Sequence, residues 1–176
     1  MTGLKYGLVQ VYTGDGKGKS TAAFGLALRA AGHGLKTVII QFMKTPDYGE
    51  HKALARLKPE IEIKTFGRRG FVYREGAKPE DYELARAGLE YAREVMDHRE
   101  AHLLILDEIN VALHYGLLPE SEVLDLLHKR PPEIEVVLTG RYAPEAIKAA
   151  ADLVTEMRPL KHPYEKGVEA RQGIEF

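Results

Sequence analysis

Short apolar runs alternate with amphipathic or small-residue segments along most of the chain. The apolar runs predict strands at residues 4–12, 36–42, 61–65, 103–106, 135–139 and 153–157. The intervening segments predict helices at residues 20–31, 50–57, 79–96, 109–115, 120–129 and 143–150. Strands that alternate with helices predict an α/β fold, with a mainly parallel sheet and helices on both of its faces.

The segment that begins at Pro79 has the clearest helical pattern. Its apolar positions form one stripe at helical spacing, made of Tyr82, Ala85, Leu89, Ala92 and Met96. The charged residues Glu83, Arg86, Glu90 and Arg93 lie off this stripe. We therefore expect the stripe to pack in the core. The run at 36–42 is almost continuously apolar, which is typical of a parallel strand that is buried on both faces.

The composition is that of a single globular domain covering residues 1–176, with an irregular tail from about residue 158. The net charge is −1, which argues against a nucleic-acid binder. The absence of Cys excludes disulfides, a thiol nucleophile and cysteine metal sites. No apolar run approaches membrane-spanning length, and Lys5 interrupts the region where a signal peptide would be apolar. We expect a cytoplasmic protein without membrane contact.

A glycine-rich segment lies between the first predicted strand and the first predicted helix. It reads Thr-Gly-Asp-Gly-Lys-Gly-Lys-Ser-Thr over residues 13–21. Strand, glycine loop, Lys-Ser and helix is the order typical of a phosphate-binding loop. Glycines let the backbone approach phosphate oxygens, while the loop N–H groups and the helix N-terminus point at the anion. Lys19 would add charge near the β- and γ-phosphates, and the Ser20 hydroxyl would ligate Mg²⁺.

This loop departs from the usual pattern at one position, because Thr13 stands where Gly is expected. The alternative interpretation is a glycine-rich turn between strand and helix, which leaves Lys17 and Lys19 unexplained. We favour a nucleotide site formed by Gly14, Asp15, Gly16, Lys17, Gly18, Lys19, Ser20 and Thr21.

Charged residues follow two other predicted strands. Asp107 and Glu108 come directly after the run at 103–106, and Arg141 follows the run at 135–139. The carboxyl ends of parallel strands meet at one sheet edge, so these side chains should lie beside the glycine loop. The carboxylates would then hold Mg²⁺ or its waters. The alternatives are acids favoured at a helix N-terminus, and an arginine engaged in a surface ion pair.

Residues 66–74 contain two glycines, three arginines and three aromatics without a clear period. Composition alone favours a solvated turn with one aromatic tucked inward over a functional loop.

Together these patterns predict a P-loop NTPase-like, RecA-like domain that uses ATP and Mg²⁺. The residues alone do not separate an ATPase, a small-metabolite kinase and another ATP-dependent transferase.

Several stretches together resemble the P-loop family of corrinoid adenosyltransferases. They lie at 13–23, 29–34 (Arg-Ala-Ala-Gly-His-Gly), 41–44 (Gln-Phe-Met-Lys), 70–73 (Gly-Phe-Val-Tyr), 106–108 (Leu-Asp-Glu), 138–141 (Leu-Thr-Gly-Arg) and 156–163 (Glu-Met-Arg-Pro-Leu-Lys-His-Pro). The resemblance spans nearly the whole chain. It includes the glycine loop that begins with Thr, and its most diagnostic part is the tail.

The resemblance implies transfer of the 5′-deoxyadenosyl group of ATP to cobalt(I) of a corrinoid, with release of triphosphate, in adenosylcobalamin biosynthesis. By motif, residues 14–21 would bind the triphosphate, and Lys17 and Lys19 would stabilise it. Ser20 and Glu108, with Asp107 beside them, would serve Mg²⁺. Arg29 and Arg141 would approach the nucleotide. Phe71 and Tyr73 would lie on the lower corrin face and displace the axial base.

The same resemblance implies a homodimer and an electron donor such as a flavoprotein. Tyr73 stands where some relatives carry Trp. Some relatives have an N-terminal helical extension over the site, whereas this sequence starts at its first predicted strand, so we expect the lid to be absent or supplied otherwise. The rival interpretations remain a small-metabolite kinase and a RecA-like ATPase.

Overall fold

The computed structural model describes residues 3–46, 48–68 and 76–175. Within these residues one sheet contains β1 (Val9–Thr13), β2 (Thr37–Phe42), β3 (Ile61–Phe66), β4 (Leu103–Asp107), β5 (Glu135–Thr139) and β6 (Leu153–Glu156). The strand order is β3-β2-β4-β5-β1-β6, and every pair is parallel. Parallel neighbours need crossover connections, which the helices provide. The expected α/β fold is confirmed.

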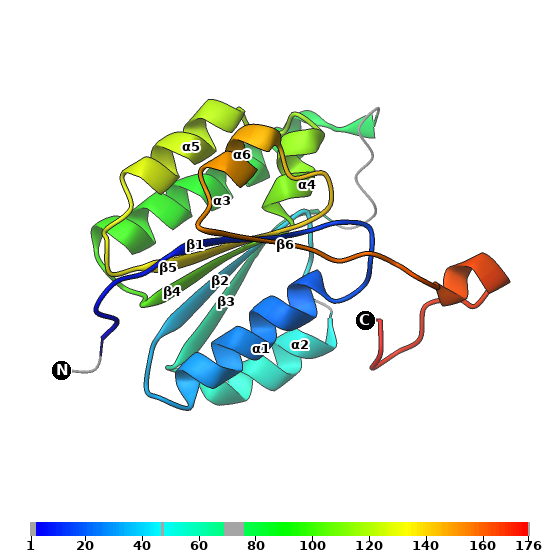
Figure 1. Ribbon diagram of the computed structural model, residues 1–176, viewed down its shortest axis with the longest axis horizontal. Helices are drawn as coiled ribbons and strands as arrows, with labels where there is room; N and C mark the ends of the chain where they lie inside the picture. Colours follow the sequence, from blue (N-terminus) through cyan, green and yellow to red (C-terminus); the bar gives the residue numbers. More distant parts are fainter. Residues whose placement is uncertain (1–2, 47, 69–75, 176) are drawn as a thin grey trace.

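The helices cover both faces of the sheet, as the alternating pattern predicted. They are α1 (Lys19–Ala31), α2 (Gly49–Leu54), α3 (Pro79–Asp97), α4 (Ile109–His114), α5 (Glu120–His128) and α6 (Glu145–Ala149). Figure 1 shows α1 and α2 on one face and α3 to α6 on the other. Short 3₁₀ turns lie at Ala55–Leu57 and Pro163–Lys166.

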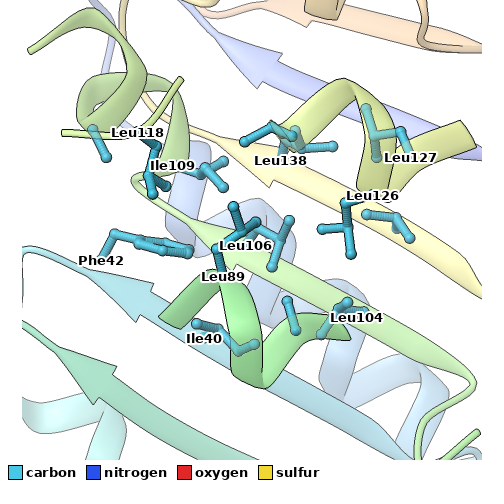
Figure 2. Close-up of a cluster of buried hydrophobic side chains, with 14 of the residues drawn as sticks. Ile40, Phe42, Leu89, Leu104, Leu106, Ile109, Leu118, Leu126, Leu127 and Leu138 are labelled. Carbon is cyan, nitrogen blue, oxygen red and sulfur yellow. The ribbon is translucent and has the colours of Figure 1, made fainter. Parts of the chain in front are cut away.

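Side-chain alternation along the strands divides the core into two layers. On β2, Ile40 and Phe42 join the layer under α3, whereas Ile39 joins the layer over α1. Leu104 and Leu106 of β4 likewise belong to the α3 side, where they lie among leucines from α3 and α5 (Figure 2). A strand that is buried on both faces needs apolar residues at successive positions, which explains the continuous run at 36–42.

The layer over α1 is built from small residues. Ala23, Ala27 and Ala30 are buried against the sheet at helical spacing. Small side chains let the helix backbone approach the strands closely. This packing holds the N-terminal end of α1 at the carboxyl end of β1, where the glycine loop joins them.

Two local predictions are wrong. The first strand begins at Val9 rather than at residue 4, because Gly7 packs outside the ladder and donates its N–H to the Pro132 carbonyl at 2.7 Å. In α3 the buried position of the first turn is Asp81, not Tyr82, which is 45% exposed. The Asp81 carboxylate accepts hydrogen bonds from Arg68 Nε and the Lys78 N–H, each at 2.8 Å, so a capping acid takes the place expected for an apolar side chain.

Candidate nucleotide site

The glycine loop contains two positions with a positive φ directly before the first helix. It connects β1 to α1, and α1 begins at Lys19 directly after Gly18, whose φ is +121°. Gly14 has a φ of +93°. Residues with a Cβ rarely adopt such angles, so both positions need glycine. The N-terminus of the 13-residue α1 therefore opens directly onto the loop, which is the arrangement that binds anions.

Lys19 lies inside the loop rather than beside it. Its side chain is buried, and its Nζ donates a hydrogen bond to the Gly16 carbonyl at 2.7 Å. Burial lowers the pKa of Lys19, an effect opposed by the Glu108 carboxylate and reinforced by Arg141. A cation held this way is ready to pair with a phosphate oxygen.

The chain just after β6 crosses the glycine loop. The Gly16 N–H donates to the Met157 carbonyl at 2.7 Å, and the Met157 N–H donates to the Thr13 carbonyl at 2.8 Å. A Cβ on Gly16 would lie 2.7 Å from the Met157 carbonyl oxygen, and one on Gly14 would lie 2.5 Å from the same atom. These glycines therefore accommodate the protein's own backbone, a reason for them that the sequence analysis missed.

Asp107 is fully buried at the end of β4, and both of its oxygens have partners. Oδ2 accepts from Lys44 Nζ at 3.0 Å and from Gln41 Nε2 at 2.9 Å. Oδ1 accepts from Thr139 Oγ1 at 2.7 Å. Burial acts to raise the pKa of Asp107, but the Lys44 ammonium and these hydrogen bonds, with one from Ser20, hold the pKa below its usual range. Asp107 is therefore an anion whose charge is already matched within the protein.

Glu108 differs from its neighbour. Its backbone is in the left-handed region, with a φ of +63°, which is uncommon for a residue other than glycine. Its N–H donates a hydrogen bond to Thr139 Oγ1 at 3.0 Å. Burial raises the pKa of Glu108, and the nearby Asp107 charge adds to this effect. No hydrogen bond from the described residues reaches its carboxylate, which lines the pocket. Of the two acids, Glu108 has the oxygens available to a ligand.

These groups surround one pocket of about 670 Å³ at the carboxyl edge of the sheet. Its walls include loop residues 15–21, Glu108, Arg141, Lys44 and Tyr48. Residues of the tail, His162 and Gly173 to Glu175, close part of its rim. The structure thus brings the glycine loop, Glu108 and Arg141 together, as expected. It adds Lys44 and Tyr48, which pattern reasoning did not select.

Comparison with known proteins identifies the family. The model of the family described as "ATP:corrinoid adenosyltransferase BtuR/CobO/CobP" matches residues 5–176. This chain belongs to that family. A corrinoid adenosyltransferase from Pseudomonas aeruginosa is 37% identical over 171 residues, which cover 97% of this chain and 84% of the relative. A corrinoid adenosyltransferase from a Sinorhizobium species is 39% identical over 173 residues, which cover 97% of this chain and 80% of that relative.

The fold agrees with a solved structure of a different kind. A KaiC-like protein from Pyrococcus horikoshii superposes with a TM-score of 0.58, covering 86% of this chain and 73% of that one. The sequence identity is 20%, so this similarity supports the RecA-like P-loop fold alone. As a member of the ATP:corrinoid adenosyltransferase family, the chain is an ATP-dependent transferase. Family membership therefore excludes the kinase and ATPase interpretations of the sequence.

The two arginines implied by the family resemblance lie in different places. Arg141 lines the pocket, and its Nη1 is 3.9 Å from Asp15 Oδ1, which links the β5 end to the glycine loop. Arg29 is exposed in the last turn of α1, ten residues after Lys19 and thus roughly 15 Å further along the helix axis. Within this chain, Arg29 therefore lies away from the glycine loop and is not part of the pocket lining.

Lys17 points toward the tail of this adenosyltransferase. Its Nζ donates to the Ile174 carbonyl at 3.0 Å and to Glu175 Oε1 at 2.9 Å. Arg171 also pairs with Glu175, and these bonds lower the pKa of that carboxyl to about 2. The tail is therefore folded back onto the glycine loop, and Figure 1 shows it returning toward the start of α1.

Phe71 and Tyr73, the aromatic pair implied by the family, lie outside the described residues. Among the residues that the structure does describe, no helix is both long and apolar enough to span a bilayer.

Proposed function

We propose that the pocket holds ATP by its triphosphate and presents C5′ of the ribose to cobalt(I) of a corrinoid. Cobalt(I) supplies the electron pair of the new cobalt–carbon bond, the C5′–oxygen bond breaks, and its electron pair leaves on triphosphate. The observation that carries the proposal is the gathering of Lys19, Arg141 and the α1 N-terminus around one pocket in a chain of this family. These groups would stabilise the charge that develops on the leaving group.

The chemistry asks for no nucleophile from the protein, because the corrinoid supplies it. The protein would orient the two substrates, exclude water and stabilise the leaving triphosphate. The composition fits this division of labour, since the chain has no Cys. The pocket lining includes the cations Lys19, Lys44 and Arg141, which can stabilise a leaving anion.

The donor set at the acidic edge fits Mg²⁺. The Ser20 hydroxyl and the Glu108 carboxylate line the pocket, and oxygen donors are those that Mg²⁺ prefers. No group of three or more His, Cys, Asp or Glu side chains in the described ranges forms a metal cage. Mg²⁺ at this place would therefore take part of its coordination from triphosphate oxygens, and when bound it supplies charge that stabilises the leaving group.

The identity of the phosphate product tests the position of the bond that breaks. We expect one triphosphate for each corrinoid adenosylated and no stoichiometric ADP, because attack occurs at C5′ rather than at the γ-phosphorus. The protein is incubated anaerobically with ATP and a cobalt(I) corrinoid, and the phosphate products are separated by ion-exchange chromatography. The control omits the reduced corrinoid and should consume little ATP. ADP and orthophosphate formed beside an unchanged corrinoid would contradict the proposal.

We further propose that Phe71 and Tyr73 contact the lower corrin face, on the strength of the family resemblance. Phe71→Ala and Tyr73→Ala are expected to lower corrinoid conversion by about fivefold or more while leaving ATP affinity within about twofold, since loss of an aromatic contact costs about 1 kcal/mol. The optical spectrum of bound cobalt(II) corrinoid should lose its base-off form. Retention of that form with full activity in both variants would mean that these aromatics only pack.

The resemblance also supports a cytoplasmic homodimer that receives electrons from a donor such as a flavoprotein. One feature of the fold is consistent with association: β6 lies at a sheet edge, and its Leu153 and Val154 are 40% and 44% exposed. Light scattering on the purified protein should then give twice the 19.7 kDa chain mass. A monomeric mass at working concentration would remove the dimer from the proposal.

A further inference from the structure

Lys44 is a largely buried cation of the nucleotide pocket to which the proposed function gives no role. It follows β2 and lies on the wall of the nucleotide pocket. The preceding residue, Met43, has a φ of +59°, and its N–H donates to the Phe66 carbonyl at 2.9 Å. A Cβ on Gly67 would lie 2.3 Å from the Lys44 backbone nitrogen. A backbone held this closely, in a conformation unusual for Met, fixes where the Lys44 side chain starts.

The Lys44 side chain ends on Asp107. The distance from Nζ to Oδ2 is 3.0 Å, and only 19% of the Lys44 side chain is exposed, against none of Asp107. Gln41 occupies the same carboxylate oxygen, and Thr139 occupies the other. Every oxygen of Asp107 is therefore engaged by a donor of the protein itself.

This ion pair sets the charge of the acidic edge. Asp107 is the last residue of β4 and is fully buried, while Glu108 follows it directly and lines the pocket. Two free carboxylates beside the Ser20 hydroxyl would attract a divalent cation. With Lys44 on Asp107, the pair carries a formal charge of −1 rather than −2, and one carboxylate is withdrawn from coordination.

We propose that Lys44 stands in for a divalent cation at the acidic pair while the pocket holds no nucleotide, so that Mg²⁺ enters together with the triphosphate. The inference rests on the proposed role of this pocket in binding Mg-ATP. Glu108 and Ser20 alone form a weak site, and triphosphate oxygens complete it. Lys44 is a positioning residue in this scheme, since it acts through Asp107.

Binding of Mn²⁺, which substitutes for Mg²⁺ and is visible by electron paramagnetic resonance, tests the idea without corrinoid or turnover. We expect the nucleotide-free wild-type protein to bind Mn²⁺ at least tenfold more weakly than the protein with ATP. Equally tight binding without nucleotide would overturn the role of Lys44 and leave the metal site standing. No binding even with ATP would overturn both the metal site and this inference.

Variants then identify the residue responsible. Lys44→Met frees Asp107 and is expected to tighten Mn²⁺ binding to the nucleotide-free protein at least tenfold. Lys44→Arg keeps the charge and should restore the weak binding of the wild type, and adding Asp107→Asn to Lys44→Met should abolish the gain. Lys129→Met, which removes the same charge from an exposed site on the far helix layer, is the matched control and should change nothing. Unchanged Mn²⁺ affinity in a folded Lys44→Met protein overturns the inference; if that variant does not fold, the wild-type comparison with and without ATP decides it.

Discussion

Replacement of Lys19 by Ala is expected to lower kcat/KM for ATP by at least a hundredfold. Lys19 is a buried cation inside the glycine loop, so its loss removes charge from the place where the leaving triphosphate would sit. Removing one preorganised donor to a developing negative charge typically costs about 10²–10³ in rate. The measurement is ATP binding by calorimetry together with initial rates of corrinoid adenosylation.

The fold should survive this change. The hydrogen bond lost is the one from Nζ to the Gly16 carbonyl, and a single hydrogen bond contributes about 1 kcal/mol to the free energy of unfolding. The melting temperature should therefore shift by only a few degrees. Lys129→Ala, at the exposed residue that follows α5, is the matched control and should keep full activity. Wild-type nucleotide affinity and turnover in Lys19→Ala would remove the phosphate-binding role of the loop.

Gly16→Ala is expected to damage both stability and nucleotide binding. The new Cβ would lie 2.7 Å from the Met157 carbonyl oxygen and 3.0 Å from the Arg158 carbonyl carbon, and both neighbours are backbone atoms. Such overpacking costs about 1–3 kcal/mol, because either the loop or the crossing segment must move. If the loop moves, its N–H groups no longer point at the phosphates, so the affinity of the protein for ATP should fall at least tenfold. Urea unfolding and calorimetry measure the two effects.

Gly25→Ala provides the contrasting control for this prediction. Gly25 lies within α1, and a Cβ there would have no neighbour within 4 Å. The substitution should therefore stabilise the protein by about 0.5–1 kcal/mol, as expected for Gly to Ala in a helix interior. If Gly16→Ala also unfolds at or above the wild-type urea midpoint, the segment after β6 does not restrain the loop in solution.

Most of the fold follows from local patterns in the sequence. The continuous apolar runs at β2 and β4 predict strands that are buried on both faces, and every residue of both strands is buried in the structure. The wrong predictions occur where a hydrogen bond, which the hydrophobic pattern does not reveal, decides the local structure. Asp81 occupies the first-turn position expected for Tyr82, because its carboxylate caps the helix and pairs with Arg68.

The location of the candidate site was predictable wherever neighbouring residues in the sequence form a recognisable motif at the end of a strand. The glycine loop, Asp107 with Glu108, and Arg141 all stand at the ends of predicted strands, and parallel topology brings such ends together. Lys44 also follows a strand, but a single lysine after an apolar run is common and has no pattern of its own. Its importance comes from a contact with Asp107, 63 residues away, which only the folded chain displays.

The two acids show why position alone does not assign roles. They are neighbours in the sequence, yet their environments differ. The Thr139 hydroxyl accepts a hydrogen bond from the Glu108 backbone N–H and donates one to the Asp107 carboxylate. Asp107 is fixed by protein donors, whereas Glu108 faces the pocket. No residue-level pattern distinguishes them, because the difference arises from the strand beside them.

The crossing of the glycine loop by Met157 has a consequence for how the protein is made on the ribosome. β1 pairs only with β5 and β6, among the last strands to be synthesised, and the loop that follows β1 is hydrogen-bonded to a residue about 140 positions later. Such distant contacts form late, since loop closure must precede them. A nascent chain that has emerged only as far as α5 therefore carries its phosphate-binding motif without the partners that shape it. Competence to bind nucleotide therefore has to wait for the segment after β6, about 140 residues beyond the motif itself.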